Sequence, residues 1–490
     1  MVAKADGECY NGQRKMKRGL TMKSTDLYIA PRASAQALNA YYARCTAQRH
    51  EIQTLQIWQG DECLVRVAPA PYRCTDRREV YSLSKTFCST AVGVLCDEGK
   101  LSVEDRIVDI FPDKLPPVVS ENLAAMRVRH VLSMNTGHVR CVMPKMFRAE
   151  DAVRAFLDEE VVYEPGTHFA YNTGATYLLA QIVVRITGES LYDYLSRKIL
   201  FPIGARDVAW NASHDGVNEG GIGIQVTSDD IIRLGRLYLN RGVWEGKRLL
   251  SEKWIDDATS FHTDNSMNGT PDWKSGYGYQ IWLNAREGYR GDGAFGQLMV
   301  ILPSKNMLIA VQGIVPSMQD EVDNLYTLAD GLLSLPLGGT PEIPAFEPAA
   351  ADDDPAVLPD AFYKLNENVF GWTMLHVYRT EDGFIMDVSN GRRISRLSAG
   401  RGAYLFSEYT ECWRKPKLNG LMDAHVPETI RTAAFYTVKE GSVVITARHL
   451  CDPHTETITL HPDGDAIRVT FSCANLLAPE AKEISGTRIG

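Results

Sequence analysis

A change of patterning at residues 336–359 divides this chain of 490 residues into two parts. The segment reads PLGGTPEIPAFEPAAADDDPAVLP, and its proline, glycine, alanine and consecutive aspartates are typical of a linker. Helical and strand-like patterns are mixed before it, whereas strand-like alternation dominates after it. We therefore expect a flexible tail at 1–23, a first domain at 24–335, this linker, and a second domain at 360–486.

The second domain reads as all-β. Turn signals occur at Glu381-Asp382-Gly383, Asn390-Gly391, Glu440-Gly441 and Pro462-Asp463-Gly464. Between them lie apolar alternating runs such as 442–446. This spacing predicts up-and-down hairpins that close into a small barrel or a sandwich and fold as an independent unit. Whether that unit borders a functional cleft or only packs outside it is left open.

The first domain mixes both kinds of element. Residues 24–48 read as a helix, and Ile52 to Arg66 read as a hairpin. Further helical patterns lie at 150–158, 173–187, 229–240 and 319–334, and strand-like runs lie at 278–282, 296–302 and 307–313. Strands at both ends of the segment predict one α/β domain whose sheet joins the early strands to the late ones.

Composition excludes several classes of protein. With 44% hydrophobic and 23% charged residues the chain is globular, and its net charge of −9 argues against nucleic-acid binding. No run approaches the ~20 apolar residues of a membrane span. The basic N-terminus has no apolar stretch, so it does not read as a secretion signal. We expect a soluble, cytoplasmic protein without nucleic-acid or membrane partners. The sequence does not predict its oligomeric state.

The cysteines and histidines do not form a metal-binding pattern. Ten cysteines are scattered without a C-x-x-C pair, and the eleven histidines form no H-E-x-x-H motif. In the absence of an export signal we expect the cysteines to be reduced packing residues. The sequence therefore predicts neither a metal nor a cofactor.

The segment Ser82-Leu83-Ser84-Lys85 places a hydroxyl and an amine three residues apart where a helix begins. Residues at i and i+3 share a helix face, so Lys85 can reach the Ser82 hydroxyl. A lysine in a poorly hydrated cleft loses basicity and can take or relay that proton. The helix N-terminus also favours the negative charge that develops on an attacked carbonyl. These features outline a serine acyl-transfer site.

The context of this motif favours a rigidly held serine. Phe87, Ala91, Val94 and Leu95 form a stripe that would bury one helix face, and Gly99 stands where a terminating glycine belongs. The alternative is that Ser82 only caps the helix. Cys88 is a second conceivable nucleophile, but its position inside the apolar helix favours packing.

Two later segments could complete such a site. Residues 165–174 place Tyr171 on a tight loop before a helix. Beside a lysine ammonium the pKa of a tyrosine falls, which would allow phenolate chemistry; the alternative is an ordinary packing aromatic. Residues 289–297 are rich in glycine and lead into a strand, so a substrate could approach the backbone there and an N–H could complete an oxyanion hole. The alternative for this segment is a hairpin corner.

The three segments, in this order, resemble the serine β-lactamase and penicillin-binding-protein-like superfamily, especially its class C β-lactamase, esterase and D-aminopeptidase branch. The resemblance covers roughly residues 35–335. It includes further phrases at 131–138, 201–205, 220–223, 228–230, 239–246 and 276–280. It implies an α/β domain with an antiparallel sheet flanked by helices, a helical subdomain, and a site between them.

The resemblance implies Ser82, Lys85 and Tyr171 as catalytic residues. It implies an oxyanion and substrate-binding set of Ala294, Gly293, Gly291, Thr173 and Asn172. The chain departs from the family in two motifs: Thr173 replaces the asparagine of Tyr-x-Asn, and Gly291 occupies the position of a usual Lys or His. That cation helps to hold the carboxylate of penicillins, and Arg290 should point to the opposite strand face. The absence of a Lys or His at position 291 therefore disfavours β-lactam substrates.

We therefore expect a serine hydrolase that forms an acyl-enzyme on a small ester or amide. Ser82 attacks while Lys85 and Tyr171 take its proton, the N–H groups of Ser82 and Ala294 hold the oxyanion, and Tyr171 then serves the leaving group and the attacking water. The alternatives are acyl transfer to an alcohol, β-lactamase or penicillin-binding activity, and a catalytically silent binding protein.

Overall fold

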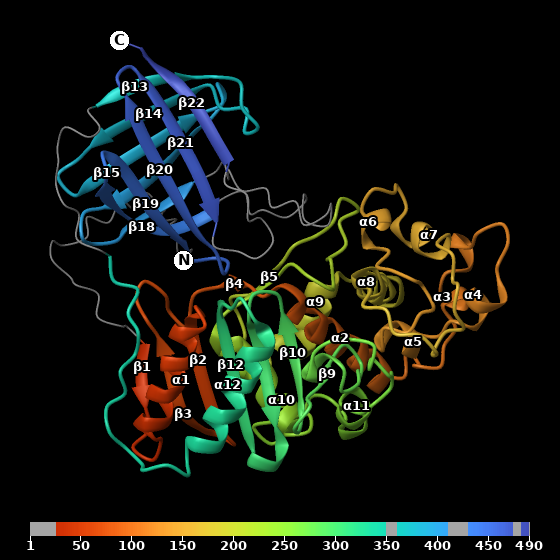
Figure 1. The fold of residues 1–490 in the computed structure, drawn as a ribbon. Helices are drawn as coiled ribbons and strands as arrows, with labels where there is room; N and C mark the ends of the chain where they lie inside the picture. Colours follow the sequence, from red (N-terminus) through yellow and green to blue (C-terminus); the bar gives the residue numbers. More distant parts are fainter. Residues whose placement is uncertain (1–25, 349–359, 410–429, 474–481, 490) are drawn as a thin grey trace, which may run out of the picture.

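The structure, a computed structural model, describes residues 26–348, 360–409, 430–473 and 482–489. The expected tail at 1–23 and residues 349–359 of the expected linker lie outside the described residues. Figure 1 shows a part built from a sheet and helices, and a strand-rich part, drawn in blue tones, at one end of it.

The first part contains a seven-stranded antiparallel sheet in the order β1-β3-β2-β12-β11-β10-β9. Its strands are β1 (Asp26–Ile29), β2 (Glu51–Gln59), β3 (Glu62–Ala68), β9 (Trp282–Leu283), β10 (Tyr289–Gly293), β11 (Gln297–Leu302) and β12 (Met307–Ile314). Early β2 pairs with late β12, with Ile57 opposite Ile309. The sheet therefore joins both ends of the domain, as the sequence predicts.

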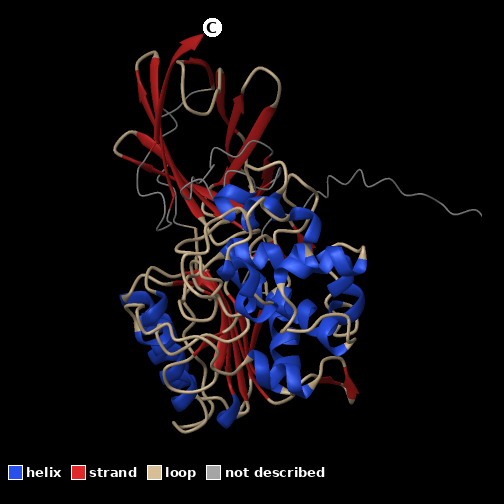
Figure 2. Cartoon of the chain, turned by 90° about the vertical axis from the view of Figure 1, so that its right-hand side faces the viewer, coloured by secondary structure: helices blue, strands red, loops and turns tan. Residues whose placement is uncertain are grey.

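Helices cover both faces of this sheet, which Figure 2 shows nearly edge-on. The helices are α1 (Ala35–Ala47), α2 (Ser84–Asp97), α3 (Ile107–Ile110), α4 (Glu121–Ala125), α5 (Val128–Leu132), α6 (Met143–Met146), α7 (Ala152–Leu157), α8 (Thr173–Thr187), α9 (Leu191–Leu195), α10 (Ser228–Leu239), α11 (Glu252–Ala258) and α12 (Met318–Gly331). Because side chains alternate along a strand, Leu298 and Val300 of β11 pack with α1 and α12, whereas Met299 and Ile301 join the core beneath α2 and α10.

Short strands and turns connect these layers. They are β4 (Arg78–Glu79), β5 (Ala209–Trp210), β6 (Ile224–Val226), β7 (Val243–Trp244) and β8 (Lys247–Arg248), with 3-10 turns at Tyr81–Leu83, Pro112–Lys114, Pro271–Trp273 and Pro303–Lys305 and a π-helical turn at Ser196–Leu200. α2 packs against α8, so the buried serine helix lies between the sheet and the helical subdomain.

The second part is a closed barrel. Its strands are β13 (Ala361–Leu365), β14 (Met374–Arg379), β15 (Gly383–Ser389), β16 (Ile394–Gly400), β17 (Leu405–Tyr409), β18 (Ile430–Lys439), β19 (Ser442–His449), β20 (Thr455–Asp463), β21 (Ala466–Cys473) and β22 (Lys482–Ile489). A contact between β16 and β18 closes a ring of 9 strands, and β17 pairs with β18. The ring resolves the choice between barrel and sandwich.

Two expected elements differ from the structure. The expected helix at 24–48 begins with β1, and α1 starts only at Ala35, where the side chain of Ser34 accepts a hydrogen bond from Ala37 N. The expected strand at 278–282 is mostly a turn, because Gln280 adopts a left-handed φ of 61° and only Trp282 enters β9. In both places a cap or turn overrides the apolar pattern.

The two parts share polar contacts. Arg448 of β19 pairs with Glu51 of β2 at 2.7 Å. Arg78, which is fully buried, donates to the carbonyl oxygen of Asp452 at 2.9 Å. The barrel thus contacts the first domain next to the serine segment. Each helix in the described part of the chain is too short or too polar to span a membrane.

Candidate active site

Ser82 lies in a tight turn that feeds directly into α2. The turn is a single 3-10 turn, Tyr81–Leu83, so the serine precedes the α-helix instead of lying in its first turn. Tyr81 adopts a left-handed φ of 48°, which is strained for a residue with a bulky side chain. The predicted stripe Phe87, Ala91, Val94 and Leu95 is buried, and Gly99 ends the helix with a φ of 65°. The turn is therefore rigidly anchored.

Lys85 is buried beside this serine. Its Nζ lies 3.2 Å from Ser82 Oγ, 3.3 Å from Thr173 Oγ1 and 2.8 Å from the carbonyl oxygen of Gly221. Only 1% of Lys85 is exposed, and this burial lowers its pKa to about 7. At neutral pH a substantial fraction of the amine is neutral and can accept a proton.

Tyr171 completes a cluster around the serine hydroxyl. Lys85 Nζ lies 4.8 Å from the centre of the Tyr171 ring, and the phenol shares a hydrogen bond with the Ser82 side chain. Burial, followed by the charge of Asp292, raises the pKa of Tyr171 well above its usual value. The expected lowering of this pKa is wrong, because burial of the phenol and the charge of Asp292 outweigh the hydrogen bond from Ser82 and the charge of Arg290. Tyr171 can therefore relay a proton as a neutral phenol.

Thr173 and Asn172, which follow Tyr171 in the chain, make different contacts. Thr173 reaches Lys85, so the residue that departs from the family motif still lies in the cluster. Asn172 is fully buried, and its Oδ1 accepts hydrogen bonds from the backbone N of Val142 and Ala175. It is the N-cap of α8 and holds the loop in place.

The glycines of β10 bring this strand against the serine turn. A Cβ on Gly293 would lie 2.0 Å from the carbonyl oxygen of Val80, and one on Gly291 would lie 2.5 Å from Leu83 Cδ1. Both positions thus face the serine turn, and a larger side chain at either one would collide with it. Gly293 and Ala294 line the cleft at Ser82, whereas Gly291 is not among the described lining residues.

A cleft of about 500 Å³ opens over Ser82. Its described lining consists of Ser82, Phe169, Tyr171, Asn268, Trp273, Trp282, Asp292, Gly293, Ala294 and Met318. Trp282 stacks on Tyr171, with ring centroids 5.4 Å apart, and meets Phe169 edge-on at 5.9 Å. The cleft therefore has one aromatic wall suited to a compact, largely apolar acyl group.

An acidic group that the sequence reasoning missed faces the same cleft. Asp292 of β10 is 7% exposed, and it pairs with the fully buried Arg290 behind it at 3.2 Å. The Trp282 side chain also donates to it. Burial raises the pKa of Asp292, while Arg290 and Lys85 oppose that rise. The alternation Arg290-Gly291-Asp292 in a strand was the available signal, since it places both charges on one face.

Gly221 is a second residue that was missed. Its carbonyl oxygen is the shortest polar contact of Lys85, and a Cβ on Gly221 would lie 2.6 Å from Thr173 Cγ2. The run Gly220-Gly221-Ile222-Gly223 was noted in the sequence, but no spacing indicated its contact with Lys85.

Large side chains of the segments that resemble the family differ in whether they reach the cleft. Trp282 lines the cleft. Tyr279 instead stacks on His262 at 4.1 Å, and His138 is buried in a contact with Thr136. Met134 is also buried, beneath Asn172 N. Cys88 lies in the core, where burial raises its thiol pKa, so it remains an unreactive packing residue.

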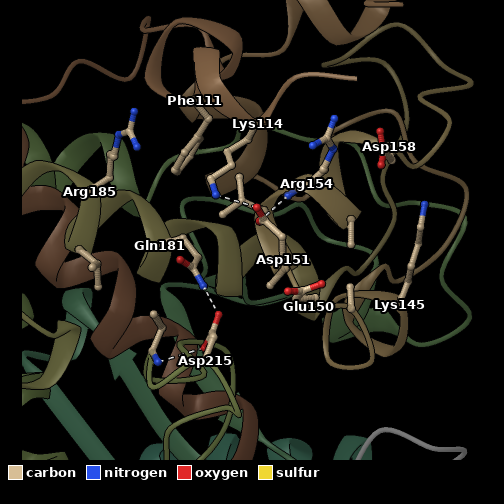
Figure 3. Close-up of a pocket in the computed structure, with 16 residues that line it drawn as sticks. Phe111, Lys114, Lys145, Glu150, Asp151, Arg154, Asp158, Gln181, Arg185 and Asp215 are labelled. Atoms are coloured by element: carbon tan, nitrogen blue, oxygen red, sulfur yellow. Dashed lines mark hydrogen bonds and ion pairs between the residues drawn. The ribbon is translucent and has the colours of Figure 1, made fainter. Parts of the chain in front are cut away.

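A larger cavity of about 880 Å³ lies in the helical subdomain (Figure 3). Two carboxylates of its lining accept hydrogen bonds there: Asp151 from Lys114 at 2.6 Å, and Asp215 from Gln181 at 2.8 Å. These contacts join the helices and loops around the cavity.

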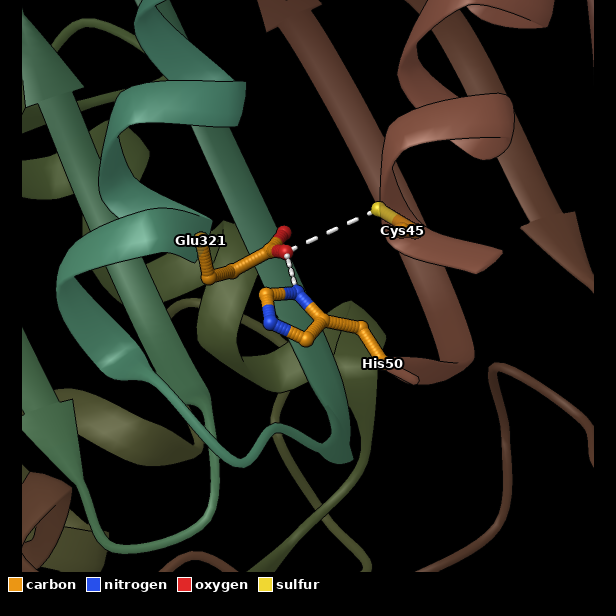
Figure 4. Close-up of side chains that lie close together, drawn as sticks. All are labelled: Cys45, His50 and Glu321. Carbon is orange, nitrogen blue, oxygen red and sulfur yellow. Dashed lines mark hydrogen bonds and ion pairs between the residues drawn. The ribbon is translucent and has the colours of Figure 1, made fainter. Parts of the chain in front are cut away.

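Cys45, His50 and Glu321 lie close enough together to hold a metal ion (Figure 4). Their contacts favour a structural role. Glu321 accepts hydrogen bonds from Tyr41 at 2.6 Å and His50 at 2.8 Å, and Cys45 lies 3.7 Å away. Burial and the nearby carboxylate raise the pKa of the Cys45 thiol, whereas a metal requires the thiolate. The cluster ties α1 to α12.

Comparisons with known proteins agree with this geometry. The 6-aminohexanoate-dimer hydrolase of Paenarthrobacter ureafaciens is 26% identical over 274 residues, which cover 52% of this chain and 70% of that protein. A penicillin-binding protein homologue from Caulobacter crescentus superimposes with a TM-score of 0.53 at 16% identity, covering 62% of this chain and 99% of the other. EstCE1, a hydrolase with promiscuous acyltransferase activity, gives 0.51 at 14% identity, with coverages of 61% and 98%.

The two solved structures show the fold alone at these identities. The family assignment rests on a direct match: the family model described as Beta-lactamase covers residues 55–326. This segment contains Ser82, Lys85, Tyr171 and the whole of β10. Because the match extends over more than half of the chain, the chain belongs to the beta-lactamase family.

Proposed function

We propose that this protein is a serine hydrolase in which Ser82 forms an acyl-enzyme with a small ester or amide. The family and the hydrolase relative support this class of reaction. The single observation that carries the proposal is the buried Lys85 amine, which has a pKa of about 7 and lies 3.2 Å from Ser82 Oγ. A base with a pKa near the working pH is well matched to activate a hydroxyl.

The reaction begins when neutral Lys85, with Tyr171 beside it, takes the proton of Ser82. Ser82 Oγ attacks the carbonyl carbon, and the N–H groups of Ser82 and Ala294 stabilise the oxyanion. Tyr171 hands a proton to the leaving alcohol or amine, which departs as the acyl-enzyme forms. The same pair then takes a proton from water, which attacks the acyl carbonyl carbon; the bond to Ser82 Oγ breaks, the proton passes to Oγ, and the acid leaves.

The charge of the cleft narrows the substrate class. Asp292 faces the cleft, while its partner Arg290 is buried behind it. A substrate carboxylate would therefore meet a carboxylate instead of the cation usual in penicillin-acting relatives. We propose neutral or positively charged acyl compounds as substrates, in preference to β-lactams and other anions.

The test is covalent labelling with a fluorophosphonate, read together with hydrolysis of 4-nitrophenyl acetate. The wild type should be labelled on Ser82, and Ser82→Ala should lose both the label and turnover by a factor of about a thousand or more. Cys88→Ala is the matched control and should keep both. An unlabelled wild type would instead favour a silent binding protein, and product analysis with an added alcohol would reveal acyl transfer.

A further inference from the structure

The loop between β19 and β20, residues 450–454, reaches from the barrel to the strand and turn that carry Ser82. The carbonyl oxygen of Cys451 accepts a hydrogen bond from Glu79 N at 2.8 Å. The next carbonyl, of Asp452, accepts from Arg78 at 2.9 Å. The loop thus runs along residues 78–81, directly before the nucleophile.

His454 of this loop contacts the residue that directly precedes Ser82. Its Nε2 shares a hydrogen bond of 2.7 Å with the Tyr81 hydroxyl, and only 1% of His454 and 7% of Tyr81 are exposed. Its ring also meets Phe295 edge-on, with centroids 5.1 Å apart. Tyr81 and Phe295 in turn meet edge-on at 5.1 Å. The three rings form one packed cluster.

This cluster holds the two backbone segments on which the proposed oxyanion site depends. Tyr81 precedes Ser82 and Phe295 follows Ala294, the two residues whose N–H groups would hold the oxyanion. Both aromatic residues have a left-handed φ, 48° for Tyr81 and 68° for Phe295. Such conformations persist only where the surroundings enforce them. His454 contacts both.

The loop is held firmly on the barrel side. His449 N donates to the carbonyl oxygen of His454 at 2.9 Å, which closes the loop. The side chain of His449 bonds Asp452 at 2.9 Å and lies 3.6 Å from Glu456. His454 is therefore presented from a rigid hairpin end.

We infer that His454 is a positioning residue through which the barrel sets the geometry of the nucleophile turn. This inference rests on the proposed serine mechanism. The described lining of the cleft contains no barrel residue, so His454 acts through Tyr81 and Phe295 rather than on the substrate. The described part of the barrel thereby supports the catalytic site without lining the cleft.

The test compares Tyr81→Phe and His454→Phe with the wild type in steady-state ester hydrolysis and in the rate of fluorophosphonate labelling. Each variant should lower kcat and the labelling rate by about tenfold to a hundredfold and leave KM within about twofold, because the reacting groups are misplaced while the cleft is intact. The double variant should lose little more than the worse single variant, since one hydrogen bond is removed in all three.

Two further variants separate positioning from general damage. His454→Gln keeps a polar group that can bond the phenol and should restore most of the activity. His376→Phe replaces a partly exposed barrel histidine that stacks on Phe362, away from the cluster, and should behave as wild type. Thermal unfolding of each variant checks that the fold is retained.

Unchanged kcat and an unchanged labelling rate in Tyr81→Phe would overturn the inference. Because this variant removes only one oxygen atom, it decides the question even if His454→Phe does not fold. Additive losses in the double variant would also overturn it. Because Ser82→Ala is tested separately, failure of the inference with Ser82 still labelled leaves the proposed function standing.

Discussion

The environment of Lys85 favours a neutral amine far more than water does. Its amine is removed from solvent, and its nearest polar contacts are two hydroxyls and one carbonyl oxygen, none of which carries a full charge. Desolvation therefore dominates and lowers the pKa to about 7. In the proposed mechanism this neutral amine takes the proton of Ser82.

The pH dependence of activity follows from this value. Below pH 7 Lys85 is protonated and cannot accept the proton, so kcat/KM should rise with pH, with an apparent pKa of about 7, and then level off. The raised pKa of Tyr171 keeps that phenol neutral throughout this range. The measurement is kcat/KM for 4-nitrophenyl acetate from about pH 5 to about pH 9, with circular dichroism as a check on folding. A profile that is flat through neutrality would contradict the role of Lys85.

Asp292 should determine which charges the cleft accepts. For 4-nitrophenyl esters of equal length that end in an ammonium, a methyl or a carboxylate group, we expect the wild type to prefer the ammonium over the carboxylate ester by roughly tenfold or more in kcat/KM. Asp292→Asn should remove most of this preference. Since the ratio is taken within one variant, a general loss of activity does not affect it.

The control for this series is Asp465→Asn, which changes the net charge equally at an exposed barrel turn and should keep the wild-type ratio. A wild type that hydrolyses the carboxylate ester at least as well as the ammonium ester would refute the proposed charge selection. Hydrolysis of β-lactams at a comparable rate would do the same.

At the scale of elements, the site depends on how closely β10 approaches the serine turn. The glycines at 291 and 293 remove the side chains that would otherwise separate this strand from Val80 and Leu83. On the other side, Asn172 caps α8 and thereby fixes the loop that presents Tyr171 and Thr173. Two elements far apart in sequence thus converge on α2.

Local signals predict most of these elements. The hairpin at Ile52 to Arg66 corresponds to β2 and β3, and the helices expected at 173–187 and 229–240 correspond to α8 and α10. These segments have a strong period and clear ends. The strand expected at 278–282 does not form. The side-chain amide of Gln280 donates to the carbonyl oxygens of Val131 and Leu132, and this tertiary contact holds the residue in a turn.

At the scale of the whole molecule, the barrel and the first domain bury polar groups against each other. Arg78 and Tyr72 are fully buried, and Tyr72 packs with Leu450 and Ala433 of the barrel. Removing the barrel would expose this surface and take away the Asp452 carbonyl from Arg78. Exposed apolar surface promotes association, and Arg78 would lose one of the two hydrogen bonds that hold it in place, keeping only the bond to Gln53.

A chain that ends at Pro336 should therefore be poorly soluble or unfold at a lower temperature than the full chain, and it should lose most of its esterase activity together with His454. The measurements are solubility, thermal unfolding and hydrolysis of 4-nitrophenyl acetate, with the full-length chain as control. A truncated protein with unaltered stability and activity would show that the barrel is a separate appendage, as the linker composition had suggested.

The sequence by itself determined the fold class, the serine and lysine pair, and the β character of residues 360–486. These depend on short-range signals: a three-residue spacing, a helical stripe and a period of two. Only the tertiary structure decided the direction of the Tyr171 pKa, the place of Asp292 in the cleft and the contact of His454 with Tyr81. A pKa depends on total burial, and His454 lies 373 residues from Tyr81 along the chain, so no local pattern carries this information.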